Sequence, residues 1–306
     1  MKINFSRIGL ARLCGWFGLT RQAYYQNGWN GIDISIEEDI LLKEVSAIRE
    51  NHKRMGTRKL YEKLGLFMLE HQIKMGRDAL FDLLSSNSML VRKRKRRIQT
   101  TQSHHWLRKY ANLIREFIPT APNQLWVSDI TYWKINSTHV YISFITDAFS
   151  HKVVGYHVAQ TMETVETIRA LKMALSGLFE EPESHFKLIH HSDRGAQYCS
   201  HEYVKLLKGN DIQISMTENG DPLENAIAER LNGILKDEYL NDSSVKSIGD
   251  ARIALTRAVY LYNEDRPHMS IGNHYPSQVH KQSLKTEKLW KNYYKKKPTI
   301  VNQFQD

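Results

Sequence analysis

The spacing of apolar residues changes near the middle of the chain. Up to about residue 90, apolar residues recur every three or four positions, which indicates amphipathic helices. Beyond residue 120, short apolar runs typical of strands alternate with helical stretches. The expected helices cover 37–52, begin at 57 and at 76, and then cover 164–179, 200–208, the region around Glu229 and 247–262; the expected strands cover 124–133, 138–147, 152–159, 186–192 and 213–216.

The order of these elements predicts an α/β fold. Two or three antiparallel strands, followed by alternating helices and strands, match the order of a ribonuclease-H-like core, a mixed five-stranded sheet with flanking helices. An all-α helix-turn-helix region precedes it. The expected parts are a short helix-turn-helix-like segment at 1–35, a helical region ending in a basic arm at 36–98, a linker at 99–119, the core at 120–280 and a basic tail at 281–306.

The first of these parts has a recognisable form. Residues 8–25 read as a helix, a turn at Gly18 and a second helix capped by Thr20. Helix-turn-helix units have this form. A simple packing hairpin gives the same pattern, and the sequence leaves both interpretations open.

Charge is distributed unevenly along the chain. The net charge is +10 overall, with +11 in residues 1–120, −6 in residues 121–280 and +5 in residues 281–306. A basic first region is expected to bind the phosphate backbone of a nucleic acid, and an acidic middle region is expected to bind cations. Lys74 and Arg77, at the start of the helix that begins at 76, are candidate DNA contacts. Six further candidates form a basic arm: Arg92, Lys93, Arg94, Lys95, Arg96 and Arg97. The alternative is that this stretch is a solvated linker without a role.

Three acidic residues fall where a pocket can form. Asp129 lies in one strand-like run, Asp193 ends another, and Glu229 lies on a helix. Carboxylates that converge repel one another unless hard cations lie between them. We therefore predict that these three acids are the catalytic residues and the ligands of two metal ions at a phosphate.

The helix that carries Glu229 has clear signals at its start and along one face. Residues 221–224 supply an acidic N-cap, a proline at the first position and a glutamate at the third. Asn225, Glu229, Asn232 and Lys236 follow at offsets of about one turn and form one polar stripe. Asn225 and Lys236 are therefore predicted DNA contacts beside the acids, although a solvated helix face has the same spacing.

Four ordered motifs resemble those of insertion-sequence transposases with a retroviral-integrase-like core. They are Trp126–Tyr132, His191–Tyr198, Asn225 to Lys236 and Tyr262–Gly272, the last similar to the family's "Y-N-x-x-R-P-H-x-S-L-G" signature. The likeness is greatest to the OrfB type of the IS-three group and covers about residues 8 to 280. Glu224 stands where an aspartate is usual, and Ile271 where a leucine is usual; neither is one of the three acids.

The resemblance implies a DNA transposase that nicks the ends of its element and joins the freed 3′-hydroxyl to another strand, so that DNA integration results. It implies two Mg²⁺ ions, with Mn²⁺ able to substitute, and a helix-turn-helix before the core whose last helix reads DNA. The implied partners are the terminal inverted repeats and target DNA, a homo-oligomer on DNA and an upstream OrfA-type protein. Supporting roles are expected for six residues of the motifs: His191, Arg194, Gln197, Tyr262, Arg266 and His268.

Composition limits where the protein can act and which cofactors it can use. Two cysteines give no disulfide framework, and the sequence shows no run of 18 apolar residues and no export signal. We therefore expect a cytoplasmic bacterial protein without a membrane role, which associates with the nucleoid when it is bound to DNA. The sequence contains no glycine-rich phosphate loop, so nucleotide use is not expected.

Two other functions are compatible with parts of this sequence. A ribonuclease-H-like nuclease without strand transfer would lack the amino-terminal helices and the Arg-Pro-His block. A DNA-binding regulator would not need the three acids.

Overall fold

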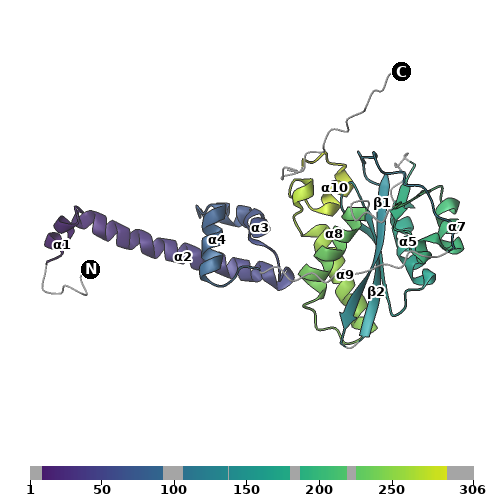
Figure 1. Cartoon of the computed structure of the whole chain (residues 1–306). Coiled ribbons are helices and arrows are strands. Elements are labelled where there is room, and N and C mark those ends of the chain that lie inside the picture. The colour runs from purple at the N-terminus through teal and green to yellow at the C-terminus, as the bar shows by residue number, and fades with distance from the viewer. Residues whose placement is uncertain (1–8, 92–105, 137, 180–186, 219–224, 288–306) are drawn as a thin grey trace, which may run out of the picture. The chain divides into compact units, whose positions relative to one another are not determined.

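The computed structural model describes residues 9–91, 106–136, 138–179, 187–218 and 225–287 (Figure 1). The chain forms two compact units, Met1–Arg92 and Lys93–Asp306. Of the predicted features, the basic arm at 92–97, the helix cap at 221–224 and most of the tail lie outside the described residues.

The first unit is helical. It contains α1 (Leu10–Trp16), α2 (Arg21–Asn51), α3 (Thr57–Glu70) and α4 (Arg77–Ser86). The predicted turn and cap are confirmed, because Gly18 has a φ of 67° and the side chain of Thr20 accepts a hydrogen bond from the Ala23 amide at 3.0 Å. Leucines of α2, α3 and α4 form one buried core: Leu41, Leu60, Leu64, Leu80, Leu83 and Leu84.

Two helix boundaries in this unit differ from the prediction. The helix expected after Thr20 and the helix expected at 37–52 form one helix, α2, which crosses the predicted boundary at 35; the stretch between them contains two Asn-Gly pairs, which favour turns, but no proline to break the helix. The helix that begins at Thr57, expected from the sequence to end before Gly65, continues to Glu70. One glycine costs a helix about 1 kcal/mol, which the continued apolar face offsets because Met68 is buried one turn after Leu64.

The second unit contains a five-stranded sheet in the order β3-β2-β1-β4-β5. Its strands are β1 (Leu125–Ile135), β2 (Thr138–Asp147), β3 (Val153–Ala159), β4 (Ile189–Ser192) and β5 (Gln213–Met216). β1 pairs antiparallel with β2 and β2 with β3, whereas β4 is parallel to both β1 and β5. The predicted mixed sheet of a ribonuclease-H-like fold is confirmed.

Helices cover both faces of this sheet (Figure 1). One face packs against α8 (Ala226–Leu235), the π-helical turn η2 (Lys236–Leu240) and α9 (Ile248–Glu264). The other packs against α5 (Thr164–Phe179), α6 (Ala196–Cys199) and α7 (His201–Gly209). A short 3-10 turn, η3 (Met269–Ile271), and α10 (Pro276–Gln282) complete the unit.

Alternation along β1 decides which side chains meet which helices. Trp126 belongs to the apolar core under α5 and α7, whereas Trp133 belongs to the core under α8 and α9. Asp129 is an even number of residues from Trp133 and so projects toward α8. The strand thus presents an acidic residue to the helix that carries Glu229.

Close packing of α5 on β3 depends on a glycine. A Cβ atom on Gly155 would lie 2.3 Å from the Ala170 carbonyl oxygen and 2.9 Å from the Ala174 Cβ. Both distances are too short for any real contact, so only glycine allows the helix to approach this strand as it does.

Candidate active site

Asp129 lies in the middle of β1, where both carboxylate oxygens have hydrogen-bond donors. Oδ1 accepts the Ile130 amide at 2.9 Å, and Oδ2 accepts the side-chain amide of Asn232 at 2.6 Å. The strand holds the backbone of Asp129 opposite Phe144 of β2. The carboxylate is therefore oriented jointly by its own strand and by α8.

Asp193 follows β4 on the neighbouring parallel strand. Val127 pairs with His191 in the ladder, and Asp129 and Asp193 each lie two residues beyond that pair. Asp193 Oδ1 accepts the Gly195 amide at 3.0 Å in a tight turn, and a Cβ on Gly195 would lie only 3.0 Å from the same oxygen. Parallel pairing thus brings the first two acids to neighbouring strands at the same level of the sheet.

Glu229 occupies the first turn of α8 and is exposed. Asn232 lies three residues later and therefore on the same face of the helix. Because Asn232 bonds to Asp129, this face of α8 is turned toward β1. Glu229 is thereby directed to the side of the sheet on which Asp129 lies.

The rest of the predicted polar stripe also contacts β1. Asn225 donates to the Ser128 carbonyl oxygen at 3.0 Å. The Lys236 amine donates to Thr131 Oγ1 at 3.2 Å and lies 4.2 Å from the centre of the Tyr132 ring. The stripe therefore packs against the strand, and the predicted DNA contacts of Asn225 and Lys236 stay predictions.

Burial and mutual repulsion alter the protonation of the acids. Burial, then the charge of Asp193, and more weakly that of Glu229, raise the pKa of Asp129 to about 7, against the hydrogen bonds from Ile130 and Asn232. Burial also raises the pKa of Glu229. Burial lowers the pKa of the Lys236 amine, partly offset by Asp237 and Asp129. Negative charge is thus costly at Asp129, and a cation beside it would relieve that cost.

The donor set fits hard divalent cations, which prefer carboxylate oxygens. Within the described residues, however, no three His, Cys, Asp or Glu side chains are grouped closely enough to hold a metal ion as they stand. The charges of Asp193 and Glu229 both raise the pKa of Asp129, which places the three acids in one electrostatic neighbourhood.

A buried network on β4 supports the strand ends. His190 Nε2 lies 2.7 Å from Ser128 Oγ and 3.0 Å from Tyr203 OH, and burial lowers the pKa of His190 to about 3, so this imidazole is neutral. His191 is buried, with Nδ1 2.8 Å from Ser215 Oγ of β5. The predicted supporting role of His191 stays a prediction; its contact with Ser215 is one way in which it could hold the strand that leads to Asp193.

Two other predicted supporting residues flank Asp193. Gln197 donates its side-chain amide to the Met162 carbonyl oxygen at 2.8 Å, which ties α6 to the segment before α5. Arg194 is half-buried beside Asp193. Neither placement tests the role expected for these residues.

The C-terminal motif forms a buried cluster. Arg266, 3% exposed, makes two hydrogen bonds to Glu238 of η2 at 2.7 and 2.8 Å. Tyr262 OH lies 3.1 Å from His268 Nε2, and the His268 ring stacks on His151. These contacts join α9 and the loop after it to the turn that follows α8.

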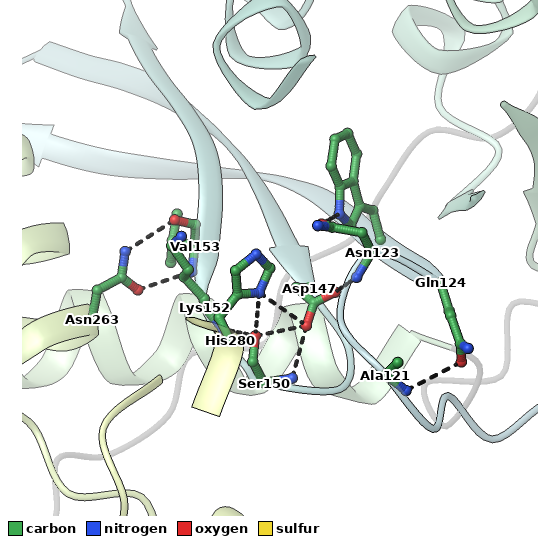
Figure 2. Close-up of polar contacts among 10 residues, drawn as sticks. Ala121, Asn123, Gln124, Asp147, Ser150, Lys152, Val153, Asn263 and His280 are labelled. Carbon is green, nitrogen blue, oxygen red and sulfur yellow. Dashed lines mark hydrogen bonds and ion pairs between the residues drawn. The ribbon is translucent and has the colours of Figure 1, made fainter. Parts of the chain in front are cut away.

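A second buried carboxylate lies at the end of β2 (Figure 2). Asp147 accepts the Asn123 amide at 2.8 Å and the Ser150 amide and hydroxyl at 2.8 and 2.6 Å, with His280 Nδ1 3.6 Å away. Although burial raises its pKa, contacts with His280 and Ser150 outweigh burial and hold the pKa of Asp147 below its usual value. Nearby, Asn263 of α9 bonds to both backbone groups of Val153.

Sequence reasoning did not single out Asn232, Glu238 or Asp147 as site or supporting residues. Asn232 was visible only as one member of the helix stripe. Arg266, the partner of Glu238, lies 28 positions further along the chain, and His280, the most distant partner of Asp147, lies 133 positions further. Such pairs have no local signal.

In the first unit, the two described DNA-contact candidates are exposed. Lys74 precedes α4. Arg77 begins α4 and pairs with its neighbour Asp78 at 2.8 Å. Their exposure is compatible with DNA contact without testing it.

Comparison with known proteins decides the family. Residues 119–222 and 210–276 match two families that are both described as integrase core domain. The insertion element IS600 31 kDa protein of Shigella sonnei is 32% identical over 270 residues, 87% of this chain and 96% of that protein. The chain belongs to the insertion-sequence transposases with an integrase core. Transposases of IS629 (Shigella sonnei, 32% identical, 80% of each chain) and IS986/IS6110 (Mycobacterium tuberculosis, 31%, 75% of this chain and 82% of that one) agree.

As a member of this family the chain is a DNA transposase, and the predicted family and fold are confirmed. Solved structures show more distant likeness. The HTLV-2 integrase catalytic core domain in complex with magnesium is 24% identical, with a TM-score of 0.42 over 52% of this chain and 97% of that one. The simian T-cell lymphotropic virus intasome is 21% identical, with a TM-score of 0.46 over 74% and 71%. Likenesses this limited do not bear on the activity. Within the described residues, no helix is long and apolar enough to cross a membrane.

Proposed function

We propose that this transposase cleaves and joins DNA strands at the site formed by Asp129, Asp193 and Glu229. The observation that carries the proposal is the placement of the three acids. Asp129 and Asp193 lie at one level of two neighbouring parallel strands, and the bond from Asn232 to Asp129 turns the face of α8 that carries Glu229 toward β1. Carboxylates gathered in this way can bind cations at a phosphate, and the raised pKa of Asp129 is consistent with that use.

The three acids would hold two Mg²⁺ ions, with Mn²⁺ able to replace Mg²⁺. Asp129 would bind them with a carboxylate that Asn232 and its own strand orient, and Asp193 and Glu229 would supply the other carboxylates. When bound, the ions would polarise the phosphate and stabilise the attacking and leaving oxygens.

The protein's own part is to position the acids. β1 and the end of β4 hold two of them at one level of the sheet, and α8 carries the third over the face of the sheet on which Asp129 lies. Water attacks the phosphorus of the phosphodiester at the element end, and the 3′-oxygen of the element leaves as a hydroxyl. That 3′-hydroxyl then attacks a phosphodiester of a second strand, from which the 3′-oxygen of that strand leaves. No covalent protein–DNA intermediate is needed, because the nucleophile is an oxygen of water or of DNA.

DNA binding is assigned to the amino-terminal region and to residues near the acids. Its candidates are Lys74 and Arg77, the arm at 92–97, and Asn225 and Lys236 on α8. The proposed substrates are the terminal inverted repeats and the target, bound by an oligomer of this chain, with an upstream OrfA-type protein as a partner in end recognition. The net charge of +11 in residues 1–120 supports this assignment.

The test is a cleavage and strand-transfer assay on a labelled element end, with and without Mg²⁺. Asp129→Asn, Asp193→Asn and Glu229→Gln should each abolish nicking and joining while DNA affinity stays within about twofold of wild type. Each amide keeps the shape of the side chain but removes the metal-binding charge. Cleavage above roughly a tenth of the wild-type rate in any one variant would remove that residue from the proposed site.

The same assay separates the alternatives. A nuclease without strand transfer would nick the end but form no joined product. A DNA-binding regulator would bind the end and do neither. Joined product that depends on Mg²⁺ supports the proposal against both.

A further inference from the structure

Residues 111–115, which we name the strap, lie against the edge of the sheet. The strap precedes β1 and belongs to the stretch that the sequence predicted to be a linker. Its first residue contacts the edge strand β5, because the Met216 amide donates to the Ala111 carbonyl oxygen at 3.4 Å. Asn112 Oδ1 accepts the Ile114 amide at 3.0 Å, which fixes a local turn within the strap.

One contact of the strap leads to Asp193. The Leu113 amide donates to Ser215 Oγ at 2.9 Å, and the same oxygen lies 2.8 Å from His191 Nδ1. His191 is fully buried in β4, two residues before Asp193. A displacement of the strap would therefore alter the environment of the Ser215 hydroxyl that His191 of β4 contacts.

Two further contacts lead to Glu229. Ile114 packs against a buried apolar cluster that includes Ala228, the residue immediately before Glu229. Glu218, which follows β5, accepts the Asn112 amide at 3.1 Å and pairs with Arg115 at 2.7 Å. The strap is thus held at a point eleven residues before Glu229 and also packs on its helix.

We propose that the strap positions Asp193 and Glu229 relative to one another, with Arg115 and Glu218 as the positioning residues that clamp it. This inference rests on the proposed function of the acids. The chain between the proposed DNA-binding region and the core would then include a segment that contacts Ser215, next to His191, and the apolar cluster around Ala228. Placement of Asp193 and Glu229 would depend on how firmly that segment is docked.

Stability alone does not explain the clamp. Arg115 is 61% exposed and Glu218 is 32% exposed, and ion pairs this exposed contribute little to folding. Direct DNA contact by Arg115 is the rival role, and it makes a different prediction. A phosphate contact would appear as a change in the salt dependence of DNA binding.

The experiment compares Arg115→Gln with Arg169→Gln in the full chain. Arg169 pairs with Glu166 at 2.8 Å and is 51% exposed, so it is a matched ion pair outside the strap. Hydrogen exchange without metal or DNA should rise about fivefold in α8 and in residues 213–217 for Arg115→Gln only. End cleavage by Arg115→Gln should fall about tenfold in kcat, because small misplacements of reacting groups are costly.

Arg115→Lys, which keeps the charge, should recover at least half of the lost rate. DNA affinity and its salt slope should be the same for all variants. Equal exchange in Arg115→Gln and Arg169→Gln would overturn the inference, as would a salt slope lowered by about 0.9 with kcat unchanged. An inactive wild type with the expected exchange difference would instead overturn only the proposed function.

Discussion

Asn232 donates its side-chain amide to Asp129 Oδ2 at 2.6 Å, which links α8 to the middle of β1. Because Asn232 lies one turn after Glu229, this single bond couples the position of the helix acid to that of the strand acid. It also lowers the cost of charge on Asp129, against the burial that raises the pKa of that carboxyl.

Replacing Asn232 should weaken catalysis more than folding. Asn232→Ala removes a hydrogen bond to a charged group, worth about 1.5–3 kcal/mol, and should lower end cleavage at least tenfold. The Mg²⁺ concentration for half-maximal rate should rise, because Asp129 is less well oriented. Asn210→Ala, which removes an amide bonded to the Leu206 carbonyl oxygen at 2.7 Å, is the control and should cleave normally.

Without metal, Asp129 should make the core less stable as pH rises. Its pKa is about 7 in the folded chain and 3.8 as the reference value, so the folded state binds the extra proton. The stabilising effect of that proton is complete below about pH 4 and is lost as pH rises to about 7. In EDTA, Asp129→Asn should therefore raise Tm at pH 8 by about 4 °C relative to wild type, and by less at pH 5.

The control for this measurement is the exposed Asp82→Asn. Its Tm should follow wild type at both pH values. A Tm difference for Asp129→Asn that is the same at pH 5 and pH 8 would contradict the raised pKa.

Gly155 should be irreplaceable for packing. Gly155→Ala places a methyl group 2.3 Å from the Ala170 carbonyl oxygen, so α5 must move, at a cost of about 1–3 kcal/mol or more. Gly177→Ala in α5 meets no atom within 4 Å and should stabilise the helix slightly. Urea denaturation of both variants checks this, and equal midpoints would refute the close approach.

Lys236 should contribute to catalysis through its charge. Lys236→Ala should lower strand transfer and the positioning of the end while Mg²⁺ binding persists, and Lys236→Arg should retain part of the activity. The Lys236 amine also donates to Thr131, so Thr131→Val should lower strand transfer less than Lys236→Ala does, because it removes this hydrogen bond but keeps the amine. Strand transfer at two salt concentrations is the measurement; wild-type joining by Lys236→Ala at both would exclude a phosphate contact.

The basic arm should bind DNA without regard to sequence. Glutamine at all six positions 92–97 should weaken binding to every sequence alike and reduce the log–log salt slope by about 0.9 for each DNA phosphate that the arm no longer neutralises. Fluorescence anisotropy with an element end and an unrelated duplex gives both slopes. If neither slope changes, the arm does not touch DNA.

Local sequence patterns predicted helices and strands better than they predicted which of these elements pack together. Apolar spacing predicted the bounds of α5 (Thr164–Phe179), whose amphipathic face is continuous, and a short apolar run predicted those of β5 (Gln213–Met216), whose last three residues are buried. The start of α2 after Thr20 was predicted, but its continuation through residues 26–36 was not, because that stretch contains two Asn-Gly pairs, which favour turns. Such local turn signals do not decide whether a helix continues.

The site shows the same division. The spacing of Asn225, Glu229, Asn232 and Lys236 predicted one helix face, but not that this face would meet β1 through Ser128, Asp129 and Thr131. Strand register decides that contact, and register depends on pairings between segments far apart in the chain. The catalytic roles of the three acids stay predictions until the amide variants are assayed.

The position of His280 beside Asp147 has a consequence for synthesis of the protein on the ribosome. Asp147 and Val153 belong to the first strands made, yet their partners His280 and Asn263 are more than a hundred residues later. A nascent chain therefore carries a carboxylate without its final partner until translation has passed α10. Gene copies interrupted before codon 263 should yield polypeptides that are cleared by proteases, rather than shortened transposases that compete for element ends.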